Sequence, residues 1–385
     1  MRWDTIMEKV GIVGYFYVKM KPELDYGRYD LVFETVRGAL DSAGLKKKDL
    51  TTVISCTNDY YDGRTISNAF CVEPGGGYLV DESKVEMDGP HAVLYALMRI
   101  LSGNHKLALV WAGSTPSCFP YDSTQLYATD PTWERPTELL NQMVSGGLQM
   151  KAYMNKYGIK VEDIAKVAVK NHKNAAKNEL ANPEAQLPNI SINDVLKSDI
   201  MSDPVTELMY AQPCDGMAAL LLAPEKQALK ITENPVWIKG VGWNQETYYL
   251  GDRNLHESKA MELASKMAFK SAGITAKDVD VAELFEHFAH EELIFAEAIG
   301  FAEKGKGPKL NSEINGDLPI NPSGGAIGGN APCATGLIRM IEAVKQLQGK
   351  AQGYQVKDAK IAVASGQVGF CAQNSILYVL EKGGN

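Results

Sequence analysis

The fold is decided by the segment ALDSAGLKKKDL at residues 39–50, which returns as AFKSAGITAKDV at residues 268–279. In each copy a helix-like stretch ends at Ala-Gly, where glycine suits the left-handed conformation that closes a helix. A strand-like run follows each copy, TTVIS at 51–55 and VAELF at 281–285. Four residues keep their order and spacing: Ser42, Ala43, Gly44 and Asp49 in the first copy, and Ser271, Ala272, Gly273 and Asp278 in the second. The matched spacing favours an internal duplication over chance reuse of a common unit.

The duplication extends outward from this segment. A β-rich run precedes each copy, at 10–18 and at 236–243, and an apolar strand follows later in each half, at 107–113 and at 360–366. Each half therefore reads β-α-β-α-β-α-β-β. This order predicts an α/β fold of two duplicated βαβαβαββ halves, with a mostly parallel sheet and helices on its faces.

Residues 114–212 interrupt the pattern of the first half. They are rich in proline and polar residues at first and then helical, and long segments inserted on a rigid α/β scaffold usually carry substrate contacts. We expect an inserted loop domain at 114–212 within an N-terminal half at 1–225, followed by a C-terminal half at 226–385. The aromatic residues of the insertion either leave room for a bulky ligand or pack against one another: Tyr121, Tyr127 and Trp133.

The composition is that of a globular enzyme. The 385 residues are 45% hydrophobic and 22% charged with a net charge of -8, which argues against disorder and against nucleic acid or an anionic membrane as the main partner. No apolar run approaches the roughly 20 residues of a membrane helix, and the first ten residues lack the apolar core of a signal peptide, so a cytoplasmic location is expected. The six cysteines form no CxxC pair and are expected to be reduced thiols.

Four long blocks carry a family resemblance. They read YMNKYGIKVEDIAKVAVKNHKNAAKN (153–178), SDPVTELMYAQPCDGMAALLLA (202–223), FEHFAHEELIFAEAIGFAEKGKG (285–307) and INPSGGAIGGNAPCATGLIRMIEAVKQLQG (320–349). In this order they resemble the loop domain, the end of the N-terminal half, the HDCF/NEAF region and the NPSGG…GHP block of the thiolase superfamily. The branch they resemble most is that of the sterol-carrier-protein-x-like and archaeal thiolases.

The resemblance implies an architecture and a ligand. In the family, each half is a five-stranded sheet, the layers stack as α-β-α-β-α, and dimers form through the N-terminal half. The resemblance also implies a coenzyme A thioester as substrate, with no permanently bound cofactor. Members of this branch often associate with a small zinc-ribbon/OB-fold protein that completes the site, so such a partner is expected too.

The residues that thiolase chemistry needs are missing at three positions. The nucleophilic Cys belongs between the strand-like run 83–87 and the helix-like run 91–103, where Asp88 and Gly89 stand, and no Cys occurs between 72 and 117. Asn330 stands where the GHP motif has its His. Ala364-Ser365-Gly366 occupies the place of the C-terminal CxG motif, so the first Cys is absent while Gly366 remains.

Three polar side chains are candidates for catalysis. His287, in the HDCF/NEAF region, is a general base or acid, or an ordinary His at a helix start. Asn330 can donate its side-chain amide to a thioester oxygen, or it is a loop residue that tolerates an unusual backbone. Asp88 is more readily explained as the N-cap of the following helix, and its functional alternative is a base where the thiolate would have been.

Further residues are expected around the substrate. Gly366 is expected to line the second oxyanion hole of the resemblance, and Cys333 is the thiol closest in sequence to Asn330, although packing explains it as well. The remaining expected substrate-binding residues are Gly89, Glu286 and Gly329. The series His287-x-x-His290-Glu291 matches no established metal spacing, so no metal site is expected.

These residues favour carbon–carbon bond chemistry without a covalent Cys intermediate. An aldol or retro-aldol reaction on a β-hydroxyacyl-CoA needs a base and an enolate-stabilising hole but no acyl carrier. One rival is Claisen-type acyl transfer, as in β-ketoacyl-CoA thiolysis, with an unrecognised nucleophile. The other is a catalytically silent subunit that binds CoA within a heteromeric complex.

Overall fold

Nine strands form one continuous sheet in the part of the chain that is described. The structure is a computed structural model that describes residues 8–63 and 65–384. Across the sheet the strands follow the order β3-β2-β4-β7-β1-β8-β11-β10-β9. Their bounds are β1 (Val10–Tyr17), β2 (Thr52–Cys56), β3 (Asp81–Val85), β4 (Ala108–Ser114), β7 (Gly216–Pro224), β8 (Val236–Gln245), β9 (Val281–Glu283), β10 (Ile361–Val368) and β11 (Asn374–Lys382).

The sheet consists of two halves with the same strand order. The series β2-β4-β7-β1 in the first half corresponds to β9-β10-β11-β8 in the second, as a duplication predicts. β1 and β8 join the halves through the pairs Gly11↔Trp237 and Ile12↔Val236. β3 forms the edge of the first half, whereas the described part of the second half has only a parallel bridge between Ala282 and Ile320 in the corresponding place.

The sheet is mixed, so the prediction of a mostly parallel sheet was wrong. β2 runs parallel to β3 and β4, and β9 runs parallel to β10. The last two strands of each half are antiparallel instead, β4 to β7 and β10 to β11. The chain between β10 and β11 is a short loop, and the insertion between β4 and β7 returns to the end of the sheet where it left. A strand that begins where its neighbour ends must run antiparallel to it.

The repeated segment has the same structure in both halves. Helix α1 (Arg28–Ser42) and helix α10 (Lys259–Ala272) are each followed by glycine in the left-handed region, with φ of 64° at Gly44 and 67° at Gly273. A one-turn 3-10 helix comes next, and the side chain of its last residue, Asp49 or Asp278, accepts the backbone amide of the residue before the turn, Lys46 or Thr275. The predicted helix–turn–strand duplication is confirmed in these segments.

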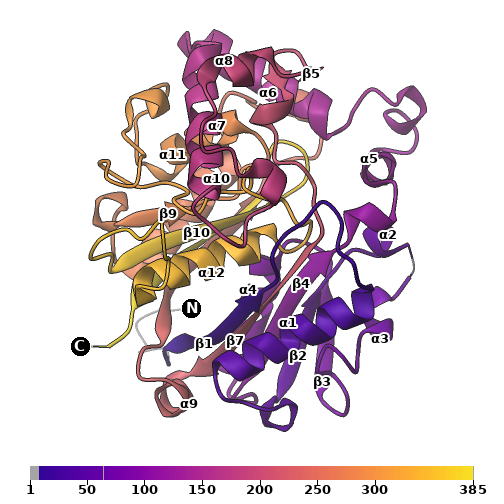
Figure 1. Ribbon diagram of the computed structural model, residues 1–385, viewed down its shortest axis with the longest axis vertical. Coiled ribbons are helices and arrows are strands. Elements are labelled where there is room, and N and C mark those ends of the chain that lie inside the picture. The colour runs from indigo at the N-terminus through magenta and orange to yellow at the C-terminus, as the bar shows by residue number, and fades with distance from the viewer. Residues whose placement is uncertain (1–7, 64, 385) are drawn as a thin grey trace.

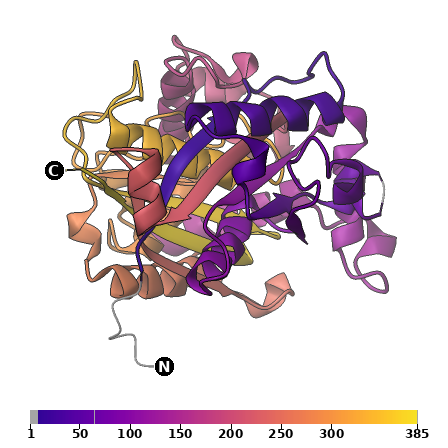
Figure 2. The same cartoon turned by 90° about the horizontal axis from the view of Figure 1, so that it is seen from below.

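The helices and the sheet form five layers (Figures 1 and 2). The central layer is α4 (Gly89–Leu101) and α12 (Thr335–Gln348), which touch each other and strands of both halves. α1 covers the outer face of the first half and α10 covers that of the second, with α11 (Ala289–Ile299) packed on α10. Because α4 and α12 lie between the two halves of the sheet, most of their residues are buried.

The insertion forms a helical layer above the two halves (Figure 1). It leaves the sheet at the end of β4 and returns at the start of β7. Its elements are α5 (Tyr121–Thr124), α6 (Gln142–Tyr157), α7 (Val161–Ala175), α8 (Ile192–Lys197), β5 (Ile200–Ser202) and β6 (Val205–Thr206). The remaining helices are α2 (Asp59–Asp62), α3 (Ser67–Phe70) and α9 (Glu225–Ile231). The predicted division of the chain after residue 225 falls at the start of α9 and stays a prediction.

The sequence predicted that the chain has no membrane-spanning helix. Within residues 8–63 and 65–384, none of the helices combines the length and the apolarity that crossing a bilayer requires.

Candidate active site

A cavity of about 310 Å³ opens where the two halves meet the insertion. It brings together four residues that the sequence proposed, although they lie up to 245 positions apart: Asp88, His287, Asn330 and Cys333. Its other lining residues are Asn58, Tyr61, Glu86, Met87, Tyr121, Gln125, Ala128, Gln142, Tyr248, Phe285, Pro332, Gln367, Val368, Gly369, Phe370 and Gln373. The cavity is therefore the candidate active site.

Asp88 lies at the N-termini of both central helices. It is the N-cap of α4, and its Oδ1 accepts hydrogen bonds from the amides of Gly89 (2.9 Å) and Gly336 (3.1 Å), the second of which belongs to α12. Its Oδ2 faces Gly366, where an added Cβ would come within 2.7 Å of it. Burial raises the pKa of Asp88 to about 7, although the surrounding backbone amides oppose the shift. The N-cap prediction is confirmed, and the same carboxyl group lines the cavity.

His287 lines the cavity from the loop that precedes α11. Its ring lies 4.6 Å from that of Phe285, and burial lowers the pKa of His287 to about 4, against an opposing contribution from Gln367. At neutral pH the imidazole is therefore uncharged, with one ring nitrogen that bears a hydrogen and one that can accept a proton. Its Nδ1 lies 3.9 Å from Oε2 of Glu291, in the first turn of α11.

Asn330 is fixed by the insertion and by α12. Its Nδ2 donates to the carbonyl oxygen of Ala211 (3.2 Å), and its Oδ1 accepts from Oγ1 of Thr335 (2.8 Å). An amide nitrogen has two N–H groups, and since Asn330 lines the cavity, the second could serve an oxygen of a ligand. The donor role predicted for Asn330 is compatible with this geometry and stays a prediction.

Cys333 contributes a thiol to the cavity wall, but in a form that is unsuited to attack. Burial raises the pKa of its thiol well above the usual value, so the thiolate is disfavoured. Its backbone has φ of 68°, a conformation that suits glycine, and its carbonyl oxygen accepts from the Gly89 amide (2.8 Å). Gly89 thus helps to shape the wall without lining it.

Besides Gly89, two predicted substrate-binding residues lie outside the cavity lining, Glu286 and Gly329, as does Gly366, which was predicted for the oxyanion hole. Glu286 is fully buried, with Oε1 accepting from Asn171 (3.0 Å) and Oε2 from Asn321 (2.9 Å). Gly329 packs against the side chain of Met20. In the structure the carboxylate of Glu286 holds loops together and does not face the cavity.

His290 does not share a face with His287. Helix α11 begins at Ala289, so His287 precedes it, and Nε2 of His290 lies 3.2 Å from Oε1 of Gln149 in the insertion. Within the described ranges 8–63 and 65–384, no three His, Cys, Asp or Glu side chains gather as a metal site requires.

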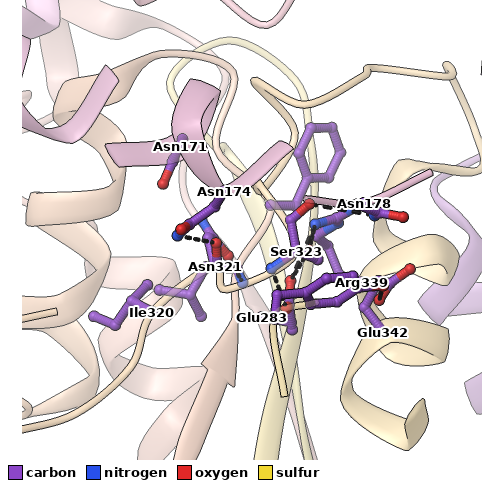
Figure 3. A network of polar contacts seen from close by, with 12 residues as sticks. Asn171, Asn174, Asn178, Glu283, Ile320, Asn321, Ser323, Arg339 and Glu342 are labelled. Atoms are coloured by element: carbon purple, nitrogen blue, oxygen red, sulfur yellow. Dashed lines mark hydrogen bonds and ion pairs between the residues drawn. The ribbon is translucent and has the colours of Figure 1, made fainter. Parts of the chain in front are cut away.

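A buried network holds the loop 320–330 from the side of the insertion (Figure 3). Asn174 of α7 donates through Nδ2 to the carbonyl oxygen of Asn321 (3.1 Å), and Asn178 donates to that of Ser323 (3.3 Å). The insertion thereby fixes the loop that ends at the cavity.

The same network continues into the central layer (Figure 3). Nη1 of Arg339, on α12, donates to Oγ of Ser323 (2.6 Å) and to Oε2 of Glu283 (3.0 Å). All three residues are buried, so each charged group depends on its partner. The Arg339–Glu283 pair joins the loop, the second half of the sheet and α12 into one rigid support.

Sequence reasoning missed several aromatic lining residues. Tyr61 stacks on Phe119 with ring centroids 5.6 Å apart and packs on Tyr121 at 5.2 Å. For Tyr121 the sequence left open contact with a ligand or packing against other aromatic residues, and in the structure it lines the cavity and packs on Tyr61. The other two aromatic residues named in the sequence lie elsewhere, Tyr127 stacked on Tyr60 and Trp133 mostly exposed.

Tyr248 closes the cavity from the second half. Its hydroxyl group accepts from the amide of Asp130 (2.9 Å) and donates to Glu134, both in the insertion. No motif marks Tyr248, so the sequence offered no signal for it. Gln367 was closer to detection, because it directly follows the predicted Gly366.

Comparisons with known sequences find related proteins. Residues 242–382 match the family model described as thiolase C-terminal domain-like. An acetyl-CoA acetyltransferase of Methanothermobacter thermautotrophicus is 29% identical over 371 residues, which cover 93% of this chain and 95% of that protein. Human sterol carrier protein 2 is 32% identical over 232 residues, covering 56% of this chain and 41% of that protein.

Two solved structures share the fold. A structure described as the Ltp2-ChsH2(DUF35) aldolase matches with a TM-score of 0.85 at 22% identity, covering 98% of this chain and 99% of that chain. A monomeric SCP2-thiolase-like protein type 1 from Mycobacterium smegmatis matches with a TM-score of 0.73 at 18% identity, covering 97% and 76%. The two halves and their insertion therefore form a thiolase-like fold, as predicted.

Proposed function

Since this chain belongs to the thiolase superfamily, we propose that it makes or breaks the carbon–carbon bond beta to a coenzyme A thioester without a Cys nucleophile. The reaction that fits the cavity best is an aldol or retro-aldol reaction on a β-hydroxyacyl-CoA. The CoA thioester is the substrate, and no permanently bound cofactor is required.

The observation that carries this proposal is the buried carboxyl group at the start of α4. The family resemblance places the nucleophilic thiol there, and Asp88 occupies that place in this chain. A carboxyl group with a pKa of about 7 can exchange a proton with an enolate at neutral pH. Cys333 is the cysteine among the described lining residues, and burial raises the pKa of its thiol, which favours the protonated form.

The residues of the cavity suit a retro-aldol sequence. His287 takes the proton of the β-hydroxyl group, the bond between Cα and Cβ breaks, and the aldehyde or ketone leaves. The electron pair passes into the thioester enolate, whose oxygen accepts the free N–H of Asn330. Asp88 in its acid form then gives its proton to Cα, which completes the shortened acyl-CoA. His287 gains one proton and Asp88 loses one, so solvent exchange restores both groups.

We also propose that the chain works in an assembly. Four exposed apolar side chains lie between α2 and the edge strand β3: Ile66, Phe70, Tyr78 and Leu79. A second copy pairing through the N-terminal half would cover them. A small zinc-ribbon/OB-fold partner is proposed as well, because the aldolase that shares the fold is named together with a DUF35 component. Light scattering of the pure chain and co-purification from the native host test the two assemblies.

Removal of the thiol tests the proposed chemistry. Cys333→Gly suits the backbone at this position, and Cys118→Ser, at an exposed thiol, is the control. We expect Cys333→Gly to retain at least about half of the cleavage rate on a β-hydroxyacyl-CoA, because the thiol forms no bond in the reaction. A loss of about 100-fold or more would overturn the proposal in favour of the Claisen-type reaction.

A further inference from the structure

Glu291 is a buried carboxyl group that contacts His287 and does not line the cavity. It lies in the first turn of α11 and is fully buried. Its Oε2 accepts hydrogen bonds from the backbone amide of His287 (2.6 Å) and from Nε2 of Gln367 (2.8 Å). Two residues that line the cavity are therefore fastened to one oxygen atom of Glu291.

The same oxygen atom faces the imidazole ring. Nδ1 of His287 lies 3.9 Å from Oε2 of Glu291, and this buried nitrogen has no hydrogen-bond partner in the structure. Because Oε2 already accepts two N–H groups, it can meet a further nitrogen only as an acceptor, so a hydrogen bond between the two requires the proton to lie on Nδ1. A small rotation of the ring would complete the contact, and such contacts are commonly long before a substrate is bound.

We propose that Glu291 is a positioning residue for His287: its carboxylate holds the proton on Nδ1, so that Nε2 faces the cavity as an unprotonated base. When Nε2 takes the proton of the substrate hydroxyl group, the imidazolium ion that forms is stabilised by the adjacent carboxylate. Glu291 itself touches no substrate. The expected effect of Glu291 on the reaction rate rests on the proposed function, whereas its effect on the tautomer of His287 does not.

The polar and charged groups around Glu291 lower its pKa relative to the value that burial alone would give, and so favour its ionised form. Burial raises the pKa of Glu291 to about 7, while the amides of Gln367, His287 and Phe288 and the charge of Arg253 oppose the shift. Arg253 is itself paired with Glu246 (3.2 Å) and donates to the carbonyl oxygen of Cys371 (2.6 Å). Burial keeps Cys371 a neutral thiol by raising its pKa. Among the described residues, Arg253 is therefore the permanent cation beside Glu291, and His287 becomes cationic only when it takes a proton.

The test is Glu291→Gln with Glu297→Gln as the matched control. Glu297 is a buried carboxyl group on the same helix, but it bonds to Tyr153 and to the amide of Gly307, away from the cavity. Nitrogen-15 NMR of the imidazoles reports the tautomer of His287 without any need for activity, and a His287→Gln spectrum assigns the signal. We expect the Nδ1–H tautomer in the parent and in Glu297→Gln, and its loss in Glu291→Gln.

Kinetics give the second readout. In Glu291→Gln we expect kcat to fall at least about tenfold with KM little changed, and the acid limb of the rate profile to move to lower pH, because the imidazolium ion loses its counter-charge. In a His287→Gln background the Glu291→Gln change should have no further effect. An Nε2–H tautomer in the parent, or an unchanged tautomer in Glu291→Gln, would overturn the proposal. If the parent cleaves no β-hydroxyacyl-CoA, the proposed function fails while the NMR result still decides the role of Glu291.

Discussion

Replacement of Asp88 by Asn should make the protein more stable at alkaline pH. Burial raises the pKa of Asp88 from 3.8 to about 7, and about three units correspond to roughly 4 kcal/mol of folding free energy. The folded carboxyl group holds its proton more tightly than the unfolded one. The stability that the protein has with Asp88 protonated is therefore fully present below about pH 4, and it is lost as the pH rises toward 7. Asn keeps the acceptor for Gly89 and Gly336 and does not titrate, and the pKa of about 7 already includes the favourable effect of these amides on the charge. We expect a net gain that approaches roughly 4 kcal/mol above pH 7.

Urea unfolding at pH 5 and pH 8 measures this difference. The free energy of unfolding should fall between the two pH values by less in Asp88→Asn than in the parent. Asp215→Asn is the control, because both oxygens of Asp215 accept hydrogen bonds, from the amides of Ser117 (3.0 Å) and Leu24 (3.0 Å). An amide there loses one acceptor, so this variant should be destabilised at both pH values.

The same variant has a catalytic consequence. The parent rate should decline as the pH rises through about 7, because Asp88 then loses the proton that it gives to the enolate. Asp88→Asn should lose at least about 100-fold in rate and should not show this limb. If Asp88→Asn were instead destabilised equally at pH 5 and pH 8, Asp88 would be an ionised N-cap, and its role as an acid would be refuted.

Three further predictions concern other parts of the site. His287→Asn should lower kcat by about 100-fold or more with KM little changed, as steady-state kinetics will show, and a rate close to that of the parent would remove His287 from the mechanism. Tyr248→Phe should raise KM about three- to tenfold, because the segment that covers the cavity loses a hydrogen bond, whereas Tyr249→Phe at the exposed neighbour should not. Arg339→Met leaves the carboxylate of Glu283 buried without its counter-charge and should lower the free energy of unfolding by roughly 3–5 kcal/mol, as urea unfolding will measure. A decrease below about 1 kcal/mol would show that the pair does not hold the central layer.

Much of the fold could be predicted from the repeated segment. Glycine after Ala43 and Ala272 ends both helices because it adopts the left-handed conformation, and this effect is local to a few residues. Strand direction was not accessible in the same way. Whether the chain returns to the same end of the sheet depends on how residues 114–212 fold, and no local pattern records that path. In the second half, the strand that would correspond to β3 is reduced to a bridge at Ile320. This also depends on tertiary pairing and is not recorded in a local pattern.

The site was predictable where a motif position survived. Asp88, His287 and Asn330 stand at family positions, and the structure brings them into one cavity. Tyr248 stands in no motif, since its place beside the cavity depends on contacts with the insertion. Glu286 was predicted to bind substrate because it matches a motif. In the structure its carboxylate instead accepts hydrogen bonds from Asn171 and Asn321 and helps to hold the loop.

The most direct test of the account is to identify the products from a β-hydroxyacyl-CoA, with the chain purified together with whatever partner remains bound in its native host. The account predicts release of an aldehyde or ketone and a shortened acyl-CoA, without added free CoA and without an acylated protein in the intact mass spectrum. Cleavage of a β-ketoacyl-CoA that requires free CoA and leaves an acyl group on the chain would contradict the central claim. Activity that resides entirely in a second thiolase chain would contradict it as well.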